Sequence, residues 1–262
     1  MDQNTVDQLA TIVDEAAHKS APIEMLTADY PEMTLDDAYT IQRASVQKRI
    51  DRGESLIGMK MGLTSQAKMD QMNVHNPIYG HLTDAMRIDD GGSIDHTDFC
   101  HPRVEPELAF VLADDLAGDV GPAEALAAVD RVVPALEIID SRYRDFEFTL
   151  IDVVADNASS SGFILGPRSA DPDELPLDNL GMILSINGET RETGSTAAIL
   201  GNPARSLASL ATMLDERDEG LEAGQIVLAG GATQAVHVEP GDHVELEVDS
   251  LGTTTFDVRP EA

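Results

Sequence analysis

The chain of 262 residues is strongly acidic, since 48 Asp and Glu against 17 Lys and Arg give a formal net charge of −31. This charge repels nucleic-acid phosphates and anionic lipid headgroups, so we expect no nucleic-acid partner and no membrane partner. Hydrophobic residues make up 42% of the chain, which is enough to build a core and argues against disorder. The length fits one large domain, alone or with a small appendage.

The basic residues are biased as well, with 4 Lys against 13 Arg. An acidic, well-hydrated surface stays soluble in concentrated salt, whereas in dilute buffer its self-repulsion loosens the fold. The composition therefore predicts a halophilic protein, and the alternative is an ordinary acidic cytoplasmic protein.

The single cysteine, Cys100, excludes an internal disulfide and a cysteine-rich zinc site. The N-terminal residues show neither the basic nor the apolar segment of a secretion signal, and no apolar run is long enough to span a bilayer. These patterns predict a cytoplasmic protein.

Two helices are predicted within the first fifty residues. In the first, apolar residues recur at helical spacing: Val6, Leu9, Ala10, Val13 and Ala17. Thr34 followed by Asp37 is a capping-box pattern at the start of the second helix, whose apolar stripe reaches Ile50. Gly53 is expected to end that helix. Residues 1–55 are therefore predicted to form an N-terminal helical segment.

The remainder, residues 56–262, is predicted to be a β-rich domain. Asn187-Gly188 is a strong hairpin-turn signal, and helices are expected over 65–72 and 203–214. Strands are expected at 56–63, 104–112, 132–139, 225–228, 236–238 and 244–248, with a last one after Gly252. Helices followed by strands predict an α+β fold, and the chain lacks the glycine-rich motifs of nucleotide-binding proteins.

Three glutamates stand out in the predicted strands. Glu105 and Glu107 are two residues apart and face the same side, while Glu137 is the one charged residue in an apolar strand. Buried carboxylates that converge repel one another unless a cation neutralises them, and oxygen ligands alone favour Mg²⁺ or Mn²⁺. The alternative is a solvated Glu-x-Glu face with Glu137 paired to an arginine. Pro106 between the first two predicts an edge or bulged strand.

Several motifs in the same order resemble the fumarylacetoacetate hydrolase superfamily. They are residues 60–65, 77–80, 102–107, 134–142 and 155–159. Within it they are most similar to the branch that contains 2-oxo-3-hexenedioate (4-oxalocrotonate) decarboxylases and 2-hydroxypenta-2,4-dienoate hydratases. The resemblance runs from about residue 5 to the C-terminus. It implies a mixed β-roll behind the helical segment, with a divalent metal held by the three glutamates in a catalytic domain over 56–262.

The resemblance also implies further site residues. Lys60 is expected to contact a substrate carboxylate or move a proton. The alternative is a surface lysine that serves solubility, which is disfavoured because the chain has only four lysines and this one lies between Gly58 and Gly62. Arg142 and Asp156 are predicted as catalytic residues. The alternative for Arg142 is an ion pair with Asp140, and the alternative for Asp156 is a place in a simple turn. Predicted substrate-binding residues are Leu63, Ser160 and Thr233.

The function implied is metal-dependent decarboxylation of 2-oxo-3-hexenedioate to 2-hydroxypenta-2,4-dienoate in the degradation of aromatic compounds. A 2-oxo acid can chelate such a metal, which stabilises the enolate formed when the distal carboxylate leaves as CO₂. The alternatives are a hydratase that converts the dienol to 4-hydroxy-2-oxopentanoate, a hydrolase of carbon–carbon bonds, and a metal-stabilised binding protein without turnover. A homo-oligomer, and a complex with a partner hydratase, are also expected.

Overall fold

The computed structural model describes residues 1–65, 69 and 77–260. Three helices form the N-terminal segment: α1 (Gln3–Lys19), α2 (Leu26–Asp29) and α3 (Leu35–Asp51). The predicted capping box is confirmed, because Thr34 accepts from the Asp37 backbone and the Asp37 carboxylate accepts from the Thr34 backbone. The short helix predicted over 65–72 falls mostly outside the described residues. No helix in the described ranges is both long and apolar enough to cross a bilayer.

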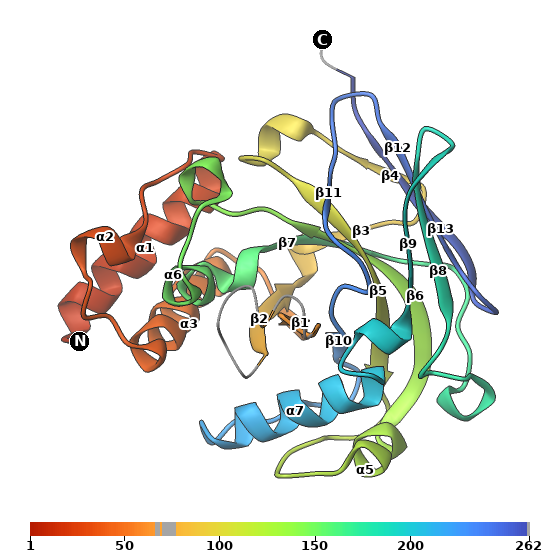
Figure 1. The fold of residues 1–262 in the computed structure, drawn as a ribbon. Helices are drawn as coiled ribbons and strands as arrows, with labels where there is room; N and C mark the ends of the chain where they lie inside the picture. The colour runs from red at the N-terminus through yellow and green to blue at the C-terminus, as the bar shows by residue number, and fades with distance from the viewer. Residues whose placement is uncertain (66–68, 70–76, 261–262) are drawn as a thin grey trace.

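A fourth helix, α6 (Leu150–Ala155), packs against α3 and α2 although it comes much later in the chain (Figure 1). Gln42 of α3 joins the parts, because its amide nitrogen donates to the carbonyls of Tyr79 and Val154 at 3.0 and 2.8 Å. The helical layer is therefore tied to the sheet through buried hydrogen bonds, and not only through apolar contacts.

The larger sheet holds the strands of interest. Its order is β2-β1-β10-β5-β6-β7-β3, with β11 beside the far end of β5. The pairs β1–β10 and β3–β7 are parallel and the others antiparallel, so the sheet is mixed. The bounds are β1 Leu56–Gly62, β2 Ile78–Thr83, β3 Arg87–Ile88, β5 Arg103–Leu112, β6 Val129–Ile139, β7 Ser160–Leu165, β10 Ile226–Leu228 and β11 Val236–His237.

The smaller sheet has the order β4-β13-β12-β8-β9 and lies beyond β6 (Figure 1). Its strands are β4 Gly92–Ile94, β8 Gly181–Ile186, β9 Glu189–Ser195, β12 His243–Val248 and β13 Gly252–Val258. The predicted hairpin turn is confirmed: Asn187 and Gly188 both have positive φ, as the turn between β8 and β9 requires.

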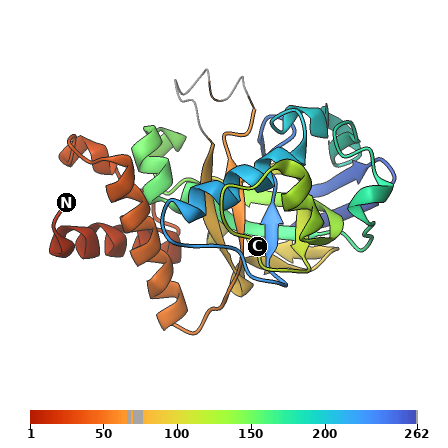
Figure 2. The same cartoon turned by 90° about the horizontal axis from the view of Figure 1, so that it is seen from below.

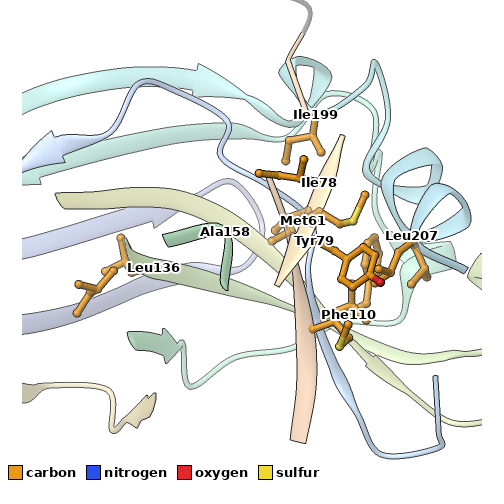
Figure 3. Close-up of a cluster of buried hydrophobic side chains, with 14 of the residues drawn as sticks. Met61, Ile78, Tyr79, Phe110, Leu136, Ala158, Ile199 and Leu207 are labelled. Atoms are coloured by element: carbon orange, nitrogen blue, oxygen red, sulfur yellow. The ribbon is translucent and has the colours of Figure 1, made fainter. Parts of the chain in front are cut away.

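Helices α5 (Pro122–Ala127) and α7 (Pro203–Asp215) cover one side of the larger sheet, apart from the N-terminal helices (Figure 2). Apolar side chains from β1, β2, β5 and α7 meet in the core that Figure 3 draws, among them Met61, Tyr79, Phe110 and Leu207. Short 3₁₀ turns complete the fold at Asp84–Met86, His96–Asp98, Pro172–Glu174 and Thr196–Ala198, and turns that contain residues with positive φ lie at Arg144–Phe146 and Asn157–Ser159.

The edge or bulged strand predicted at Pro106 is wrong, because β5 lies between β10 and β6 inside the sheet and its pairing with β6 is regular from Arg103 to Val111. The Pro106 carbonyl accepts from the Ala232 N–H at 2.9 Å, and the nitrogen of a strand residue faces the same side as its carbonyl. On that side the irregular segment between β10 and β11 replaces a regular strand. Proline has no N–H to donate, but on this side of β5 no regular strand is present to accept it. The missing hydrogen bond therefore costs little.

Candidate metal centre

The pairing of β5 with β6 brings the three predicted glutamates together. Glu105 lies directly opposite Glu137 in the register, and Glu107 is two residues further along the same face of β5. One carboxylate oxygen from each lies within 4.8 Å of the other two. All three side chains are buried, and Glu107 and Glu137 are fully so. The solvated-face alternative is therefore wrong.

Lys60 completes the cluster. It lies on β1, its side chain is 3% exposed, and its Nζ is 3.0 Å from Glu137 Oε2. The ammonium also donates to the Ala158 carbonyl at 3.0 Å. Glu137 is thus paired with a lysine instead of the arginine that the alternative invoked, and the lysine is not on the surface.

A segment after β10 closes over the carboxylates. The Gly230 N–H donates to Glu107 Oε2 at 2.7 Å. Gly230 has φ +111, and a Cβ there would overlap the Thr64 side chain, while a Cβ at Gly231 would lie 2.7 Å from Glu105 Oε2. Two consecutive glycines are therefore required for the backbone to reach the carboxylates.

The electrostatics of the cluster disfavour three negative charges. Burial raises the pKa of Glu107 well above its ordinary range, and the charges of Glu137 and Glu105 add to the rise. Burial likewise raises the pKa of Glu137, with Lys60 opposing it. Among the described residues, Lys60 opposes the rise in both pKa values without cancelling it, so the buried Glu107 and Glu137 carboxyls still favour either a proton or a further cation.

These residues fit a divalent cation. Within the described part of the chain, Glu107 Oε1 and Glu137 Oε1 are buried without a hydrogen-bond partner. A buried oxygen without a partner is costly, and a cation would satisfy it. The donor set is oxygen only and carries the charge that a 2+ ion would neutralise, which suits a hard ion such as Mg²⁺ or Mn²⁺.

Comparison with known proteins gives this arrangement its context. Residues 58–259 match the family described as fumarylacetoacetate (FAA) hydrolase C-terminal. The chain is also 48% identical over 256 residues to a 4-oxalocrotonate decarboxylase from a Pseudomonas species, which covers 98% of this chain and 99% of that one. The chain belongs to the fumarylacetoacetate hydrolase family. The resemblance predicted from the motifs is therefore confirmed.

Two other relatives show which branch of the fumarylacetoacetate hydrolase family this chain resembles and which fold it shares. A 2-oxo-hept-4-ene-1,7-dioate hydratase from Escherichia coli is 39% identical over 259 residues, 96% of this chain and 97% of that one. The structure of a 4-oxalocrotonate decarboxylase from Pseudomonas putida G7, described as complexed with magnesium and adipate, matches with a TM-score of 0.97 at 42% identity over 98% of each chain. The predicted α+β fold with a mixed β-roll is confirmed.

In this member of the fumarylacetoacetate hydrolase family, Arg142 and Asp156 lie in a separate buried network. The Arg142 guanidinium pairs with the Asp156 carboxylate and also donates to the Asp156 carbonyl and to Ser161. Asp140 instead accepts from two backbone N–H groups, so the predicted alternative pair with Asp140 is not formed. Burial raises the pKa of Asp156 to about 6, and the charge of Arg142 opposes the rise.

The predicted substrate-binding residues are also dispersed. Ser160 and Arg142 line a cavity of about 410 Å³ whose described lining does not include the three glutamates. Leu63 follows β1 with φ +55, and Thr233 comes shortly after the two glycines that cover the carboxylates. The structure thus brings Lys60 to the glutamates and leaves Leu63 and Thr233 on adjoining segments. Arg142, Asp156 and Ser160 lie together in the separate buried network. Their roles stay predictions.

Two backbone groups contribute to the site, and no residue type in the sequence reveals them. The Ala158 carbonyl holds Lys60, and the Gly230 N–H holds Glu107. Backbone groups are present at every residue, so their roles cannot be found from residue types. The Gly230-Gly231 pair after a predicted strand was the one available signal.

The raised pKa values predict how stability depends on pH. A carboxyl whose folded-state pKa lies above its unfolded value binds more protons in the folded state, so metal-free protein should lose stability as pH rises above 4.5. A cation that replaces those protons should therefore raise the melting temperature more at about pH 8 than at about pH 5.5. Thermal melts with EDTA and with Mg²⁺ at both pH values measure the difference. An equal shift at both would contradict it.

Proposed function

We propose that the protein decarboxylates 2-oxo-3-hexenedioate (4-oxalocrotonate) to 2-hydroxypenta-2,4-dienoate and CO₂ in a metal-dependent reaction. The observation that carries this proposal is the buried cluster of three glutamates and Lys60, in a chain that matches 4-oxalocrotonate decarboxylases over nearly its whole length. A cluster of this charge and burial is suited to an anionic, chelating substrate. Residues 56–262 would form the catalytic domain.

Glu105, Glu107 and Glu137 would hold the cation, Mg²⁺ with Mn²⁺ as a substitute. When bound there, a divalent cation acts as a Lewis acid that draws electrons toward the 2-oxo end of the substrate. The bond to the distal carboxylate breaks, its electron pair moves along the conjugated chain to the 2-oxo oxygen, and one proton taken up there completes the dienol.

Lys60 supplies the positive side chain at this cluster. Its ammonium has three N–H groups, of which Glu137 and Ala158 engage two among the described residues. No described residue accepts the third, and we expect it to donate to a substrate oxygen. The Gly230 N–H and Lys60 together fix Glu107 and Glu137, so the carboxylates do not have to reorganise when the substrate arrives.

The second candidate is hydration of the dienol to 4-hydroxy-2-oxopentanoate. It is favoured by the 39% identity to the E. coli hydratase over 96% of the chain, because a hydratase would use the same metal and the same 2-oxo end. The two candidate substrates differ at the distal end, where 2-oxo-3-hexenedioate carries a second carboxylate and the dienol carries none.

One assay separates these functions. We expect CO₂ and dienol to be released from 2-oxo-3-hexenedioate with Mg²⁺ and not with EDTA. Turnover of the dienol alone would identify a hydratase. Absence of turnover of either compound, with Mg²⁺ bound, would overturn the enzyme proposal and leave a metal-stabilised binding protein.

We also propose that the chain acts in the cytoplasm as a homo-oligomer that binds a partner hydratase. The dienol product is unstable, so direct transfer would protect it. Light scattering after size-exclusion chromatography, with and without such a hydratase, tests both statements, and a monomer that elutes apart from the hydratase would contradict them.

Salt dependence follows from the net charge of −31. Repulsion among surface carboxylates destabilises the folded chain, and salt screens it. We therefore expect the melting temperature and the activity to rise from dilute buffer to molar KCl. Activity that falls steadily over this range would show that the chain is not adapted to salt.

A further inference from the structure

The turn that carries the carbonyl partner of Lys60 has an unusual backbone. Asn157, Ala158 and Ser159 have φ values of 50°, 51° and 60°, so three consecutive residues other than glycine lie in the left-handed region. Asparagine tolerates this region, whereas alanine and serine adopt it at a cost in free energy. Such a turn persists only where its surroundings hold it.

Asn157 fastens the turn to β2. Its side-chain Oδ1 accepts from the His81 N–H at 2.8 Å, and its Nδ2 donates to the His81 carbonyl at 2.9 Å. The amide therefore binds both backbone groups of one strand residue. A Cβ at Gly80 would lie 2.4 Å from the Asn157 carbonyl oxygen, so glycine is needed there for the close approach.

Asp156 fastens the other side of the turn. Its carboxylate accepts from the Arg142 backbone N–H at 2.9 Å and pairs with the Arg142 guanidinium, which also binds the Asp156 carbonyl. Ala158 lies between these anchors and the start of β7, and its carbonyl accepts from Lys60 Nζ at 3.0 Å. The position of that carbonyl is thus set by the side chains of Asn157, Asp156 and Arg142, and the hydrogen bonds described for these three go to groups other than Lys60.

We propose that Asn157 is a positioning residue that fixes the Lys60 ammonium beside the three glutamates by holding the Ala158 carbonyl in place. Among the described residues, the ammonium has one neutral partner, the Ala158 carbonyl, and one charged partner, the Glu137 carboxylate. When the neutral partner moves away, the ammonium is drawn toward the carboxylate oxygens that a cation needs. The effect on turnover rests on the proposed function, while the effect on Lys60 does not.

Replacing Asn157 with glycine tests the inference, because Asn157→Gly keeps the left-handed backbone and removes only the amide. With lysine labelled by ¹³C at Cε, the four lysines give four signals, and a Lys60→Arg sample assigns the one from Lys60. We expect Asn157→Gly to shift or broaden the Lys60 signal while the signals of Lys19 and Lys48, on α1 and α3, stay. We also expect kcat to fall about 10- to 100-fold, as for other residues that orient the groups of a metal site.

Asn187→Gly is the matched control. Asn187 is also left-handed and also fastens a neighbouring strand, since it accepts from the His243 N–H and donates to Asp242, but it lies in the β8–β9 turn. It should leave the Lys60 signal and kcat unchanged. Gly80→Ala, which forces the turn away from β2, is the second variant and should move the same signal if Asn157→Gly does not fold.

A folded Asn157→Gly with the wild-type Lys60 signal and kcat would overturn the inference, as would an equal effect of Asn187→Gly. A wild-type protein without turnover would overturn the proposed function instead. In that case the Lys60 signal alone would decide whether Asn157 positions the lysine.

Discussion

Replacing Glu107 with glutamine is expected to abolish turnover while leaving the fold intact. Residues that merely orient a metal ligand cost about 10- to 100-fold when removed, so loss of a ligand should cost at least about 100-fold. The amide oxygen introduced by Glu107→Gln could still accept from the Gly230 N–H, so the segment over the carboxylates should keep its place. Steady-state kinetics at saturating Mg²⁺ measure the loss.

Although Glu107→Gln should lose activity, it should not lose stability in the metal-free state. Because burial raises the pKa of Glu107, its charged form is disfavoured, and a neutral side chain removes repulsion. The metal-free variant should therefore melt no lower than the wild type, and Mg²⁺ should no longer raise its melting temperature. Glu247→Gln is the matched control, since Glu245-Leu246-Glu247 repeats the Glu-x-Glu spacing on an exposed strand face. Loss of activity in both variants would contradict the assignment.

Replacing Lys60 with methionine should have the second large effect. Removing one partner of a buried ion pair leaves the other charge uncompensated and typically costs about 3–5 kcal/mol. Because the Glu137 carboxyl can take up a proton, the cost should shrink at lower pH. If Lys60 binds substrate or moves a proton, kcat should also fall by about 10²- to 10⁴-fold. Urea unfolding and kinetics measure the two effects.

Lys19→Met is the control for Lys60→Met. Lys19 pairs with Glu15 at 2.7 Å, but both side chains are more than half exposed, so the pair should contribute less than about 1 kcal/mol. A Lys60→Met protein as stable and active as Lys19→Met would show that the buried pair has no role in this site.

Much of the site could be predicted because its strands differ from the other acidic ones. Glu245 and Glu247 alternate with Val244, Leu246 and Val248, which is the pattern of a strand with one solvated face. Glu105 and Glu107 instead lie in a strand whose second half, from Leu108 to Leu112, is apolar on both faces, so burial of the strand is expected. The helices were predictable for a similar local reason, since Thr34 and Asp37 signal the capping box directly.

The rest depends on contacts between distant segments. Arg142 finds Asp156 instead of Asp140, because Asp140 is already bound to the backbone of Cys100 and His101. Pro106 is tolerated inside the sheet because of an irregular neighbour far along the chain. Such choices follow from tertiary packing, and local residue patterns do not contain them.

The most direct test of the account is an anomalous difference map from crystals grown with Mn²⁺ and recorded at the manganese absorption edge. We expect one strong peak within bonding distance of carboxylate oxygens from Glu105, Glu107 and Glu137. Peaks only elsewhere, or none in a crystal whose β5 and β6 carboxylates are well ordered, would contradict it.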